Sequence, residues 1–159
     1  MVDDGSDDDT KRALEVIVST FSHVELLTLP KNQGKGKALI EGFRRAKSRG
    51  YSHAVQIDAD GQHDIEQTPV LLDIANKNRH ALVSGEPIYD QSVPKARYYG
   101  RYLTHFFVSL ETLTCKLMDS MCGFRVYPID ETLEQISPAF SYFRMTFDTE
   151  IMVRLSWAG

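Results

Sequence analysis

Two aspartates that follow a short apolar run are the residues of this sequence best suited to chemistry. Asp58 and Asp60 come directly after the run 54–57 and are separated only by Ala59. Alternate side chains of an extended backbone point the same way, so the two carboxylates face one spot. Paired hard oxygen donors suit Mg²⁺ or Mn²⁺, which can bridge to a diphosphate. The alternative is a turn with solvated carboxylates, because Asp and Gly favour turns.

A third oxygen donor follows in the same segment. Gln62 carries an amide oxygen two residues past Asp60, on the same side if the chain stays extended. We therefore predict that Asp58, Asp60 and Gln62 bind a divalent cation together with a nucleoside-diphosphate sugar. His63 is interpreted as a supporting or turn histidine.

Two earlier segments have the residue types that bind a nucleotide. Asp3 and Asp4 offer acceptors for a nucleobase N–H or a ribose hydroxyl, or they form a turn that caps the next helix. The segment 32–38 places small residues before a helix, where backbone N–H groups and Lys35 or Lys37 can meet a phosphate. The alternative for this segment is a plain loop with solvated lysines.

Three arginines are candidates for phosphate contacts, because a guanidinium binds phosphate oxygens in a bidentate manner. Arg97 and Arg101 are four residues apart and share one face of a predicted helix, and Arg125 lies further along. The alternative for each is a solvated helix face.

Composition and charge narrow the class of protein. The 159 residues suffice for one domain with a real core, which we take as 1–159. A net charge of −4 argues against a nucleic-acid partner, which would require a basic face. The two cysteines show neither Cys-x-x-Cys nor zinc spacing, and neither a signal peptide nor a run long enough to span a membrane is visible. We therefore expect a cytoplasmic protein; the sequence does not predict its oligomeric state.

Apolar patterns along the chain alternate between strand and helix types. Helices are predicted with apolar faces formed by Leu14, Ile17, Val18 and Phe21; by Leu39, Phe43 and Ala46; by Leu71, Ile74 and Ala75; and by Leu103, Phe106, Phe107, Leu110 and Leu117. Strands are predicted at 24–29, 54–57, 81–85 and 124–127, and a last helix at 147–156. Such alternation predicts an α/β fold with a mostly parallel sheet flanked by helices. Because Val2-Asp3-Asp4 reads as the tip of a strand, we expect the first β-α unit to be missing.

Four motifs in order resemble one family of enzymes. They are Val2-Asp3-Asp4-Gly5-Ser6 with Asp9-Thr10; Asn32-Gln33-Gly34-Lys35-Gly36-Lys37-Ala38; Asp58-Ala59-Asp60-Gly61-Gln62-His63; and Met121-Cys122-Gly123-Phe124-Arg125 with Phe147-Asp148-Thr149-Glu150. Together they resemble the inverting family 2 glycosyltransferases of GT-A type, close to the dolichol-phosphate mannosyltransferase branch. The resemblance covers nearly the whole chain.

The resemblance implies a fold and an activity. The implied fold is the Rossmann-like GT-A fold of nucleotide-diphospho-sugar transferases, and the implied reaction is metal-dependent transfer of a sugar from a UDP- or GDP-sugar to a saccharide or lipid-linked acceptor. It places Asp3, Asp4, Gly34, Lys37, Asp58 and Arg125 at the donor. The branch often reads Gly-Ser-Arg where this chain has Gly85-Glu86-Pro87, so the phosphate of a lipid acceptor does not follow from the motifs alone. A lipid acceptor implies peripheral membrane contact at the inner face of the cytoplasmic membrane.

The same resemblance identifies candidate catalytic residues. Inversion requires a base for an acceptor hydroxyl, and Asp148 is our preferred base, with Glu150 beside it. If the acceptor is an anionic phosphate, no base is needed and these residues only orient. The alternative for both is an ordinary first-turn helix charge that complements the helix dipole.

Two alternatives come from other classes. A haloacid-dehalogenase-type phosphatase would use Asp58 as nucleophile and Asp60 as acid and base, but the sequence has no Gly-Asp-x-x-x-Asp motif downstream. The other alternative is a non-catalytic fragment of a GT-A domain that binds metal or nucleotide weakly and transfers nothing.

Overall fold

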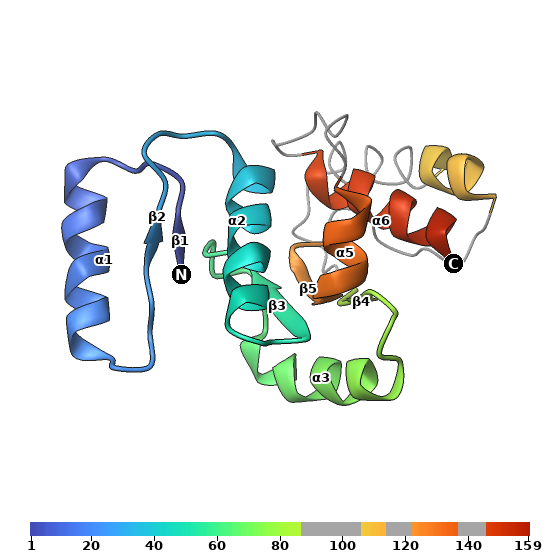
Figure 1. Ribbon diagram of the computed structural model, residues 1–159, viewed down its shortest axis with the longest axis horizontal. Coiled ribbons are helices and arrows are strands. Elements are labelled where there is room, and N and C mark those ends of the chain that lie inside the picture. Colours follow the sequence, from blue (N-terminus) through green and yellow to red (C-terminus); the bar gives the residue numbers. More distant parts are fainter. Residues whose placement is uncertain (87–105, 114–121, 137–145) are drawn as a thin grey trace, which may run out of the picture.

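The computed structural model describes residues 1–86, 106–113, 122–136 and 146–159. Helices and strands alternate along the first half of the chain (Figure 1). Residues 106–112 are also helical. The elements in order are β1 (Val2–Asp3), α1 (Asp8–Thr20), β2 (Leu27–Thr28), α2 (Lys35–Ser48), β3 (His53–Ile57), a 3-10 helix (Ile65–Gln67), α3 (Thr68–Lys77), β4 (Val83–Ser84), β5 (Phe124–Pro128), α5 (Ile129–Gln135) and α6 (Phe147–Ala158).

Several helix ends lie where local sequence signals predict them. Asp7 caps α1, and its side chain accepts a hydrogen bond from the backbone N–H of Thr10. Gly50 follows α2 with a φ of +81°, a left-handed conformation that favours glycine and ends the helix. Pro69 lies in the first turn of α3, where its missing N–H has no cost.

The central sheet has the strand order β3-β5-β4, and β5 runs antiparallel to both neighbours. The α/β class is confirmed, but the direction of β5 differs from the mostly parallel sheet that we predicted. Ile57 at the end of β3 pairs with Phe124 at the start of β5, so β5 enters the sheet at the edge where β3 ends. A strand that enters there has to run back along its neighbour.

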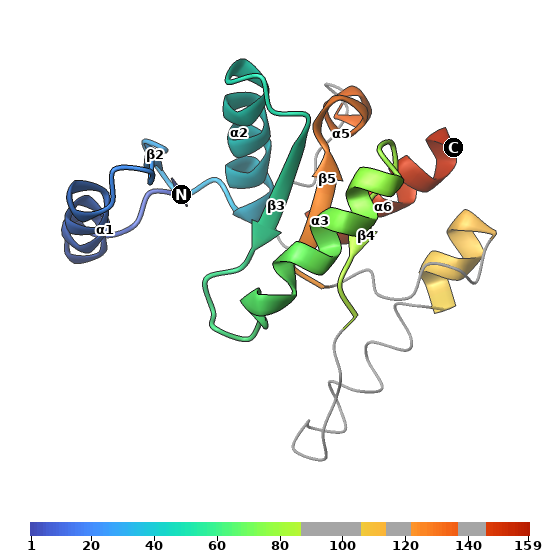
Figure 2. The ribbon, with the colours of Figure 1, turned by 90° about the horizontal axis from the view of Figure 1, so that it is seen from below.

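Helices cover both faces of this sheet (Figure 2). On one face Phe124 and Val126 of β5 pack with Leu71 and Ala75 of α3. On the other face Tyr127 packs in a cluster formed with α2, α5 and α6, whose buried members are Ile40, Phe43, Ile129, Phe147 and Ile151. The side-chain period of two therefore directs alternate residues of β5 into two separate cores.

A smaller unit precedes this sheet and contacts it through α2. β1 and β2 pair in parallel, with Val2 opposite Leu27, and α1 packs beside them (Figure 1). The apolar face of α1 is less buried than we predicted. None of its residues is fully buried, and Ile17 is 37% exposed. Little of the described chain covers that face of α1.

Two other predicted apolar faces differ from the structure. In α3, Leu71 and Ala75 are buried as predicted, but Ile74 is 43% exposed. Leu103 and Leu117 of the predicted helix 95–117 lie outside the described residues. Within 106–112, Phe106, Phe107 and Leu110 are exposed, whereas Val108 packs on Met152 and Val153 of α6. The helix is thus rotated so that its aromatic stripe faces outward.

Candidate active site

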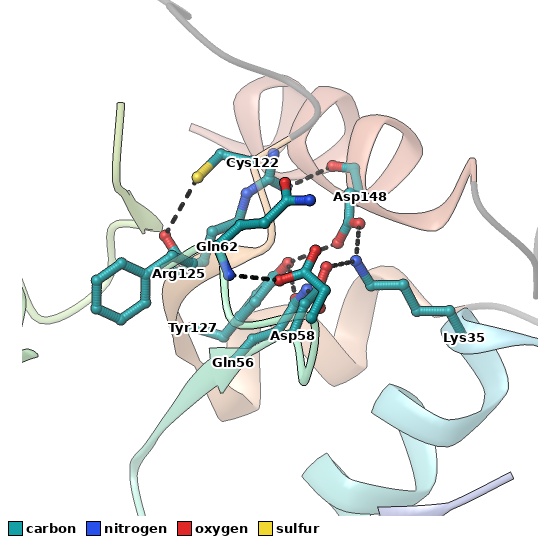
Figure 3. Close-up of polar contacts among 10 residues, drawn as sticks. Lys35, Gln56, Asp58, Gln62, Cys122, Arg125, Tyr127 and Asp148 are labelled. Atoms are coloured by element: carbon teal, nitrogen blue, oxygen red, sulfur yellow. Dashed lines mark hydrogen bonds and ion pairs between the residues drawn. The ribbon is translucent and has the colours of Figure 1, made fainter. Parts of the chain in front are cut away.

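A lysine bridges two carboxylates at the edge of the sheet where β3 ends. The Nζ of Lys35 lies 2.6 Å from Oδ2 of Asp58 and 2.7 Å from Oδ2 of Asp148. The three residues come from the first turn of α2, the end of β3 and the first turn of α6 (Figure 3). Their side chains are largely sheltered, with exposures of 20%, 28% and 6% in that order. The structure therefore joins the predicted metal-binding segment to the predicted catalytic segment through one ammonium group.

The register of β3 against β5 closes this arrangement into a ring. The Nε2 of Gln56 donates to Oδ1 of Asp58 at 3.0 Å, and the hydroxyl of Tyr127 donates to Oε1 of Gln56 at 2.9 Å. The same hydroxyl lies 3.5 Å from Oδ1 of Asp148, which returns to Lys35. Gln56, Asp58 and Tyr127 share one face of the sheet because they occupy alternate positions of paired strands.

Burial and these contacts shift two pKa values. Burial by itself lowers the pKa of Lys35, but hydrogen bonds to Asp148 and Asp58 outweigh it and raise the pKa above its usual value. Lys35 is therefore an ammonium at neutral pH. Burial also raises the pKa of Tyr127, which keeps its hydroxyl protonated as a donor within the ring.

Gly123 leaves room for the Asp58 carboxylate. A Cβ built on Gly123 would lie 2.1 Å from Oδ2 and 2.5 Å from Cγ of Asp58, far inside van der Waals contact. The backbone just before β5 thus forms one wall of the carboxylate site, and only glycine leaves that wall open.

The two N-terminal aspartates have different roles in the structure. Oδ1 of Asp3 accepts the backbone N–H of Ser6, while its buried Oδ2 has no hydrogen-bond partner within the described residues. Hydrogen bonds from Ser6 lower the pKa of Asp3 and keep it ionised, so Oδ2 is an acceptor suited to a ligand N–H or hydroxyl. Asp4 instead accepts the backbone N–H groups of Gln33 and Gly34, at 2.9 and 2.6 Å. Asp4 thus holds the loop that leads into α2 and fixes the position of Lys35 at the start of that helix.

The loop after β3 turns sooner than the sequence pattern assumed. Asp60 accepts the backbone N–H of Gln62 at 3.0 Å, and Gly61 between them has a φ of +70°. The chain is therefore not extended from Asp60 to Gln62, and the argument that strand alternation aligns Gln62 with the aspartates does not apply. Asp60 and Gln62 are both exposed. The ring of His63 is tilted against that of Phe124, with ring centroids 5.5 Å apart.

The remaining predicted site residues make contacts other than those of the bridge. Lys37 pairs with Glu41 on α2 at 2.6 Å, so Lys35 is the lysine of this segment that reaches the carboxylates. Arg125 is fully buried, and its Nη1 donates to the backbone oxygen of Asp148 at 2.6 Å; this contact holds the first turn of α6. Glu150 pairs with Arg154 at 2.6 Å along α6. Arg97 and Arg101 lie outside the described residues.

Sequence reasoning missed Gln56, Tyr127 and Gly123. A signal for Gln56 was present, because it is a polar residue within an apolar strand, two positions before Asp58. Such a residue needs a buried partner. The partner, Tyr127, lies 71 residues further along the chain, and nothing local links the two.

The carboxylates at this edge have the chemistry that a divalent cation requires. Asp58 already binds the ammonium of Lys35, and Asp60 beside it is a second hard oxygen donor. No group of three or more His, Cys, Asp and Glu side chains placed to hold a metal occurs among the described residues. Binding of a cation by Asp58, Asp60 and the amide oxygen of Gln62 therefore stays a prediction.

Comparison with known proteins finds one family and several relatives that transfer sugars. Residues 1–132 match the family described as Glycosyl transferase family 2. The chain is 30% identical to the dolichyl-phosphate beta-glucosyltransferase of Dictyostelium discoideum over 96% of its own length and 48% of that protein. It is 30% identical to the human dolichyl-phosphate beta-glucosyltransferase, over 96% of this chain and 49% of the human protein. A shorter match, 40% identical, covers 46% of the chain and 30% of the undecaprenyl-phosphate mannosyltransferase of Micrococcus luteus.

These matches bear on the alternatives. The chain spans about half the length of the dolichyl-phosphate relatives that it matches. A haloacid-dehalogenase-type phosphatase is no longer supported, because the Asp58 motif falls within the matched residues 1–132. Within the described residues, helices long and apolar enough to cross a membrane are absent.

Proposed function

Because the chain belongs to glycosyl transferase family 2, we propose that it carries the donor site of a metal-dependent, inverting glycosyltransferase that acts on a polyprenyl-type phosphate. The observation that carries this proposal is the bridge from Lys35 to Asp58 and Asp148. The bridge brings a metal-type carboxylate and an acidic residue of the last helix to one spot. The relatives named for dolichyl phosphate and undecaprenyl phosphate support the choice of acceptor.

The donor side of the site is built from the start of the chain and from the end of β3. Oδ2 of Asp3, which has no hydrogen-bond partner among the described residues, would accept a hydrogen bond from the nucleobase or the ribose. Asp4 holds the loop through Gln33 and Gly34, and the N-terminal N–H groups of α2 that follow would bind the diphosphate. A Mg²⁺ or Mn²⁺ held by Asp58, Asp60 and Gln62 would neutralise the charge on the leaving diphosphate.

The environment of Asp148 favours an acceptor that is already an anion. Both carboxylate oxygens have contacts, Oδ2 with Lys35 and Oδ1 with Tyr127, and the side chain is only 6% exposed. An acceptor hydroxyl would have to reach a buried carboxylate that Lys35 and Tyr127 already contact. A phosphate monoester needs no base: its oxygen attacks the anomeric carbon as the bond to the nucleoside diphosphate breaks, and configuration inverts. In this role Asp148 orients Lys35, and Glu150 with Arg154 stabilises α6.

A surface of exposed apolar side chains supports membrane contact. It comprises Phe106, Phe107, Leu110 and Leu113 together with Trp157 of α6, each more than half exposed. Trp157 Nε1 donates to the backbone oxygen of Glu111 at 3.1 Å, so the two helical segments are adjacent. Aromatic side chains of this kind partition well into a lipid interface. We propose that this surface lies against the bilayer that holds the acceptor.

A binding test and a transfer test examine the proposal separately. The purified chain is melted with Mn²⁺ and one nucleotide sugar at a time, and stabilisation by UDP- or GDP-sugars is expected. Full-length protein is then incubated with the stabilising donor and a polyprenyl phosphate, and a glycosyl phosphate with inverted anomeric configuration is expected. Donor binding without transfer by the full-length protein would favour a non-catalytic binding domain. A product with retained configuration would rule out single displacement.

A further inference from the structure

The position of Lys35 implies competition with the metal. Its ammonium lies 2.6 Å from Oδ2 of Asp58, which is hydrogen-bonding distance for a charged pair. The other oxygen of Asp58 accepts Gln56 Nε2 at 3.0 Å. Both oxygens of the carboxylate are therefore already engaged, one by a cation of the protein itself. A divalent cation that binds Asp58 through Oδ2 would approach the ammonium of Lys35 to contact distance.

We propose that Lys35 is a built-in cation of the resting site, which the divalent metal must displace from Asp58 in order to bind. This inference rests on the proposed function, because it takes Asp58 as a ligand of the metal. Two positive charges cannot share one carboxylate oxygen at contact distance without strong repulsion. Of the two donors to Asp58, the ammonium is the one that the metal expels.

The structure also provides a place for the displaced ammonium. Asp148 Oδ2 lies 2.7 Å from Lys35 Nζ and is not among the proposed metal ligands. Lys35 can release Asp58 and keep its bond to Asp148, so that a buried charge is never left without a partner. The donor site and the acidic residue of α6 would then respond together when metal enters.

The competition has a measurable consequence for the metal alone. Binding to the wild-type chain includes the free energy needed to break the bond from Lys35 to Asp58. A neutral side chain at position 35 removes that cost and also removes a repelling charge. We expect Lys35→Gln to bind Mn²⁺ about tenfold more tightly than wild type, a factor in the range of one partly sheltered charge-assisted hydrogen bond.

Isothermal titration calorimetry with Mn²⁺ and no nucleotide tests this expectation. Lys35→Arg keeps the positive charge and is expected to bind as weakly as wild type. Lys47→Gln is the matched control, because Lys47 also lies on α2 and pairs with an aspartate, Asp130, at 2.8 Å, but on the exposed surface. An affinity of Lys35→Gln equal to or weaker than that of wild type would overturn the inference. Equal tightening in Lys35→Arg would also overturn it, because charge would not be the cause.

A measurement on the wild-type chain covers the case in which Lys35→Gln fails to fold. Saturating Mg²⁺ should raise the reactivity of Lys35 toward an amine-modifying reagent relative to Lys47, as read by peptide mass spectrometry. Unchanged relative reactivity would overturn displacement. Failure of the metal site itself is recognised separately: Asp60→Ala would then leave Mn²⁺ binding intact. If Asp60→Ala abolishes binding and Lys35→Gln does not tighten it, only the role of Lys35 fails.

Discussion

The backbone of Gly123 lies directly against the carboxylate of Asp58. Any residue with a Cβ at position 123 would clash with that carboxylate. A Cβ at position 123 would lie 2.1 Å from Asp58 Oδ2. The same oxygen binds Lys35 at 2.6 Å. The absence of a side chain at position 123 therefore sets the location of the charge on which the donor site depends.

Gly123→Ala should destabilise the fold and displace the Asp58 carboxylate. Overpacking of this kind typically costs about 1–3 kcal/mol in the free energy of unfolding. Urea denaturation of Gly123→Ala, Asp58→Ala and the double variant tests the cause. In the Asp58→Ala background the cost of Gly123→Ala should largely disappear, because the clashing group is gone. If the two losses in the free energy of unfolding are additive, the strain does not come from a clash between position 123 and Asp58.

Asp60→Ala should abolish stabilisation by Mn²⁺ with UDP or GDP while the fold persists. Asp60 is exposed and accepts a local hydrogen bond from the backbone N–H of Gln62, so its removal should cost little stability. A ligand at about 100 times its Kd stabilises by about 2.7 kcal/mol, which a thermal melt readily detects. Asp73→Ala is the control, since Asp73 is an exposed aspartate paired with Lys77. Unchanged nucleotide-dependent melting of Asp60→Ala would remove this residue from the site.

Asp148→Asn separates an orienting role from a base. With a polyprenyl phosphate acceptor we expect the kcat of the full-length enzyme to fall by less than about tenfold, because general-base help is not required. A fall of about 10²–10⁴-fold with the KM for the donor unchanged would instead identify Asp148 as a general base. A parallel loss of donor binding would mean that Asp148 acts mainly by holding Lys35 in the donor site. Asp130→Asn, at an exposed aspartate, serves as the control.

With Tyr127→Phe, the free energy of unfolding should fall less steeply as the pH becomes alkaline. The folded pKa of Tyr127 is raised above its unfolded value of about 10 by burial, so the unfolded state loses this proton first. The stability linked to Tyr127 is therefore fully present below about pH 10 and is lost as pH rises toward the folded pKa, by up to about 1.4 kcal/mol per pH unit. Denaturation between pH 8 and 11 should show a shallower slope for Tyr127→Phe. A slope identical to that of wild type would contradict the prediction, and Tyr51→Phe, at a 66% exposed tyrosine, is the control.

Replacement of two exposed apolar residues should weaken membrane binding of the full-length protein. Burial of a large apolar side chain contributes about 1.5–3 kcal/mol, so Phe106→Ser with Leu110→Ser should reduce binding to phosphatidylcholine vesicles by at least about tenfold. Co-sedimentation measures the bound fraction. Phe21→Ser is the control, because Phe21 is 48% exposed at the end of α1, a helix that lies far from α6 (Figure 1). Equal binding of all three proteins would show that another part of the protein contacts the membrane.

Local features of the structure could be predicted from the sequence because short-range interactions decide them. The cap at Asp7, the left-handed glycine at position 50 and the first-turn proline of α3 depend on neighbours within a few residues. The four motifs likewise identified the family, which the match over residues 1–132 confirms. Assignments of individual site residues to donor, metal or acceptor remain predictions.

Tertiary structure decided which of these residues meet. Asp58 and Asp148 are separated by 90 positions in the sequence, and their contact with one ammonium depends on how α2 and α6 pack on the sheet. The sequence placed Lys37 at the donor, yet Lys35 is the lysine that reaches the carboxylates. Two helical positions differ by about 200° around the axis, so only one of the two can face them. The direction of β5 and the outward face of Phe106 likewise arise from packing between distant segments. The sequence alone determined the set of chemical groups and their local conformations, whereas the three-dimensional arrangement of the site was decided by long-range contacts that no local pattern encodes.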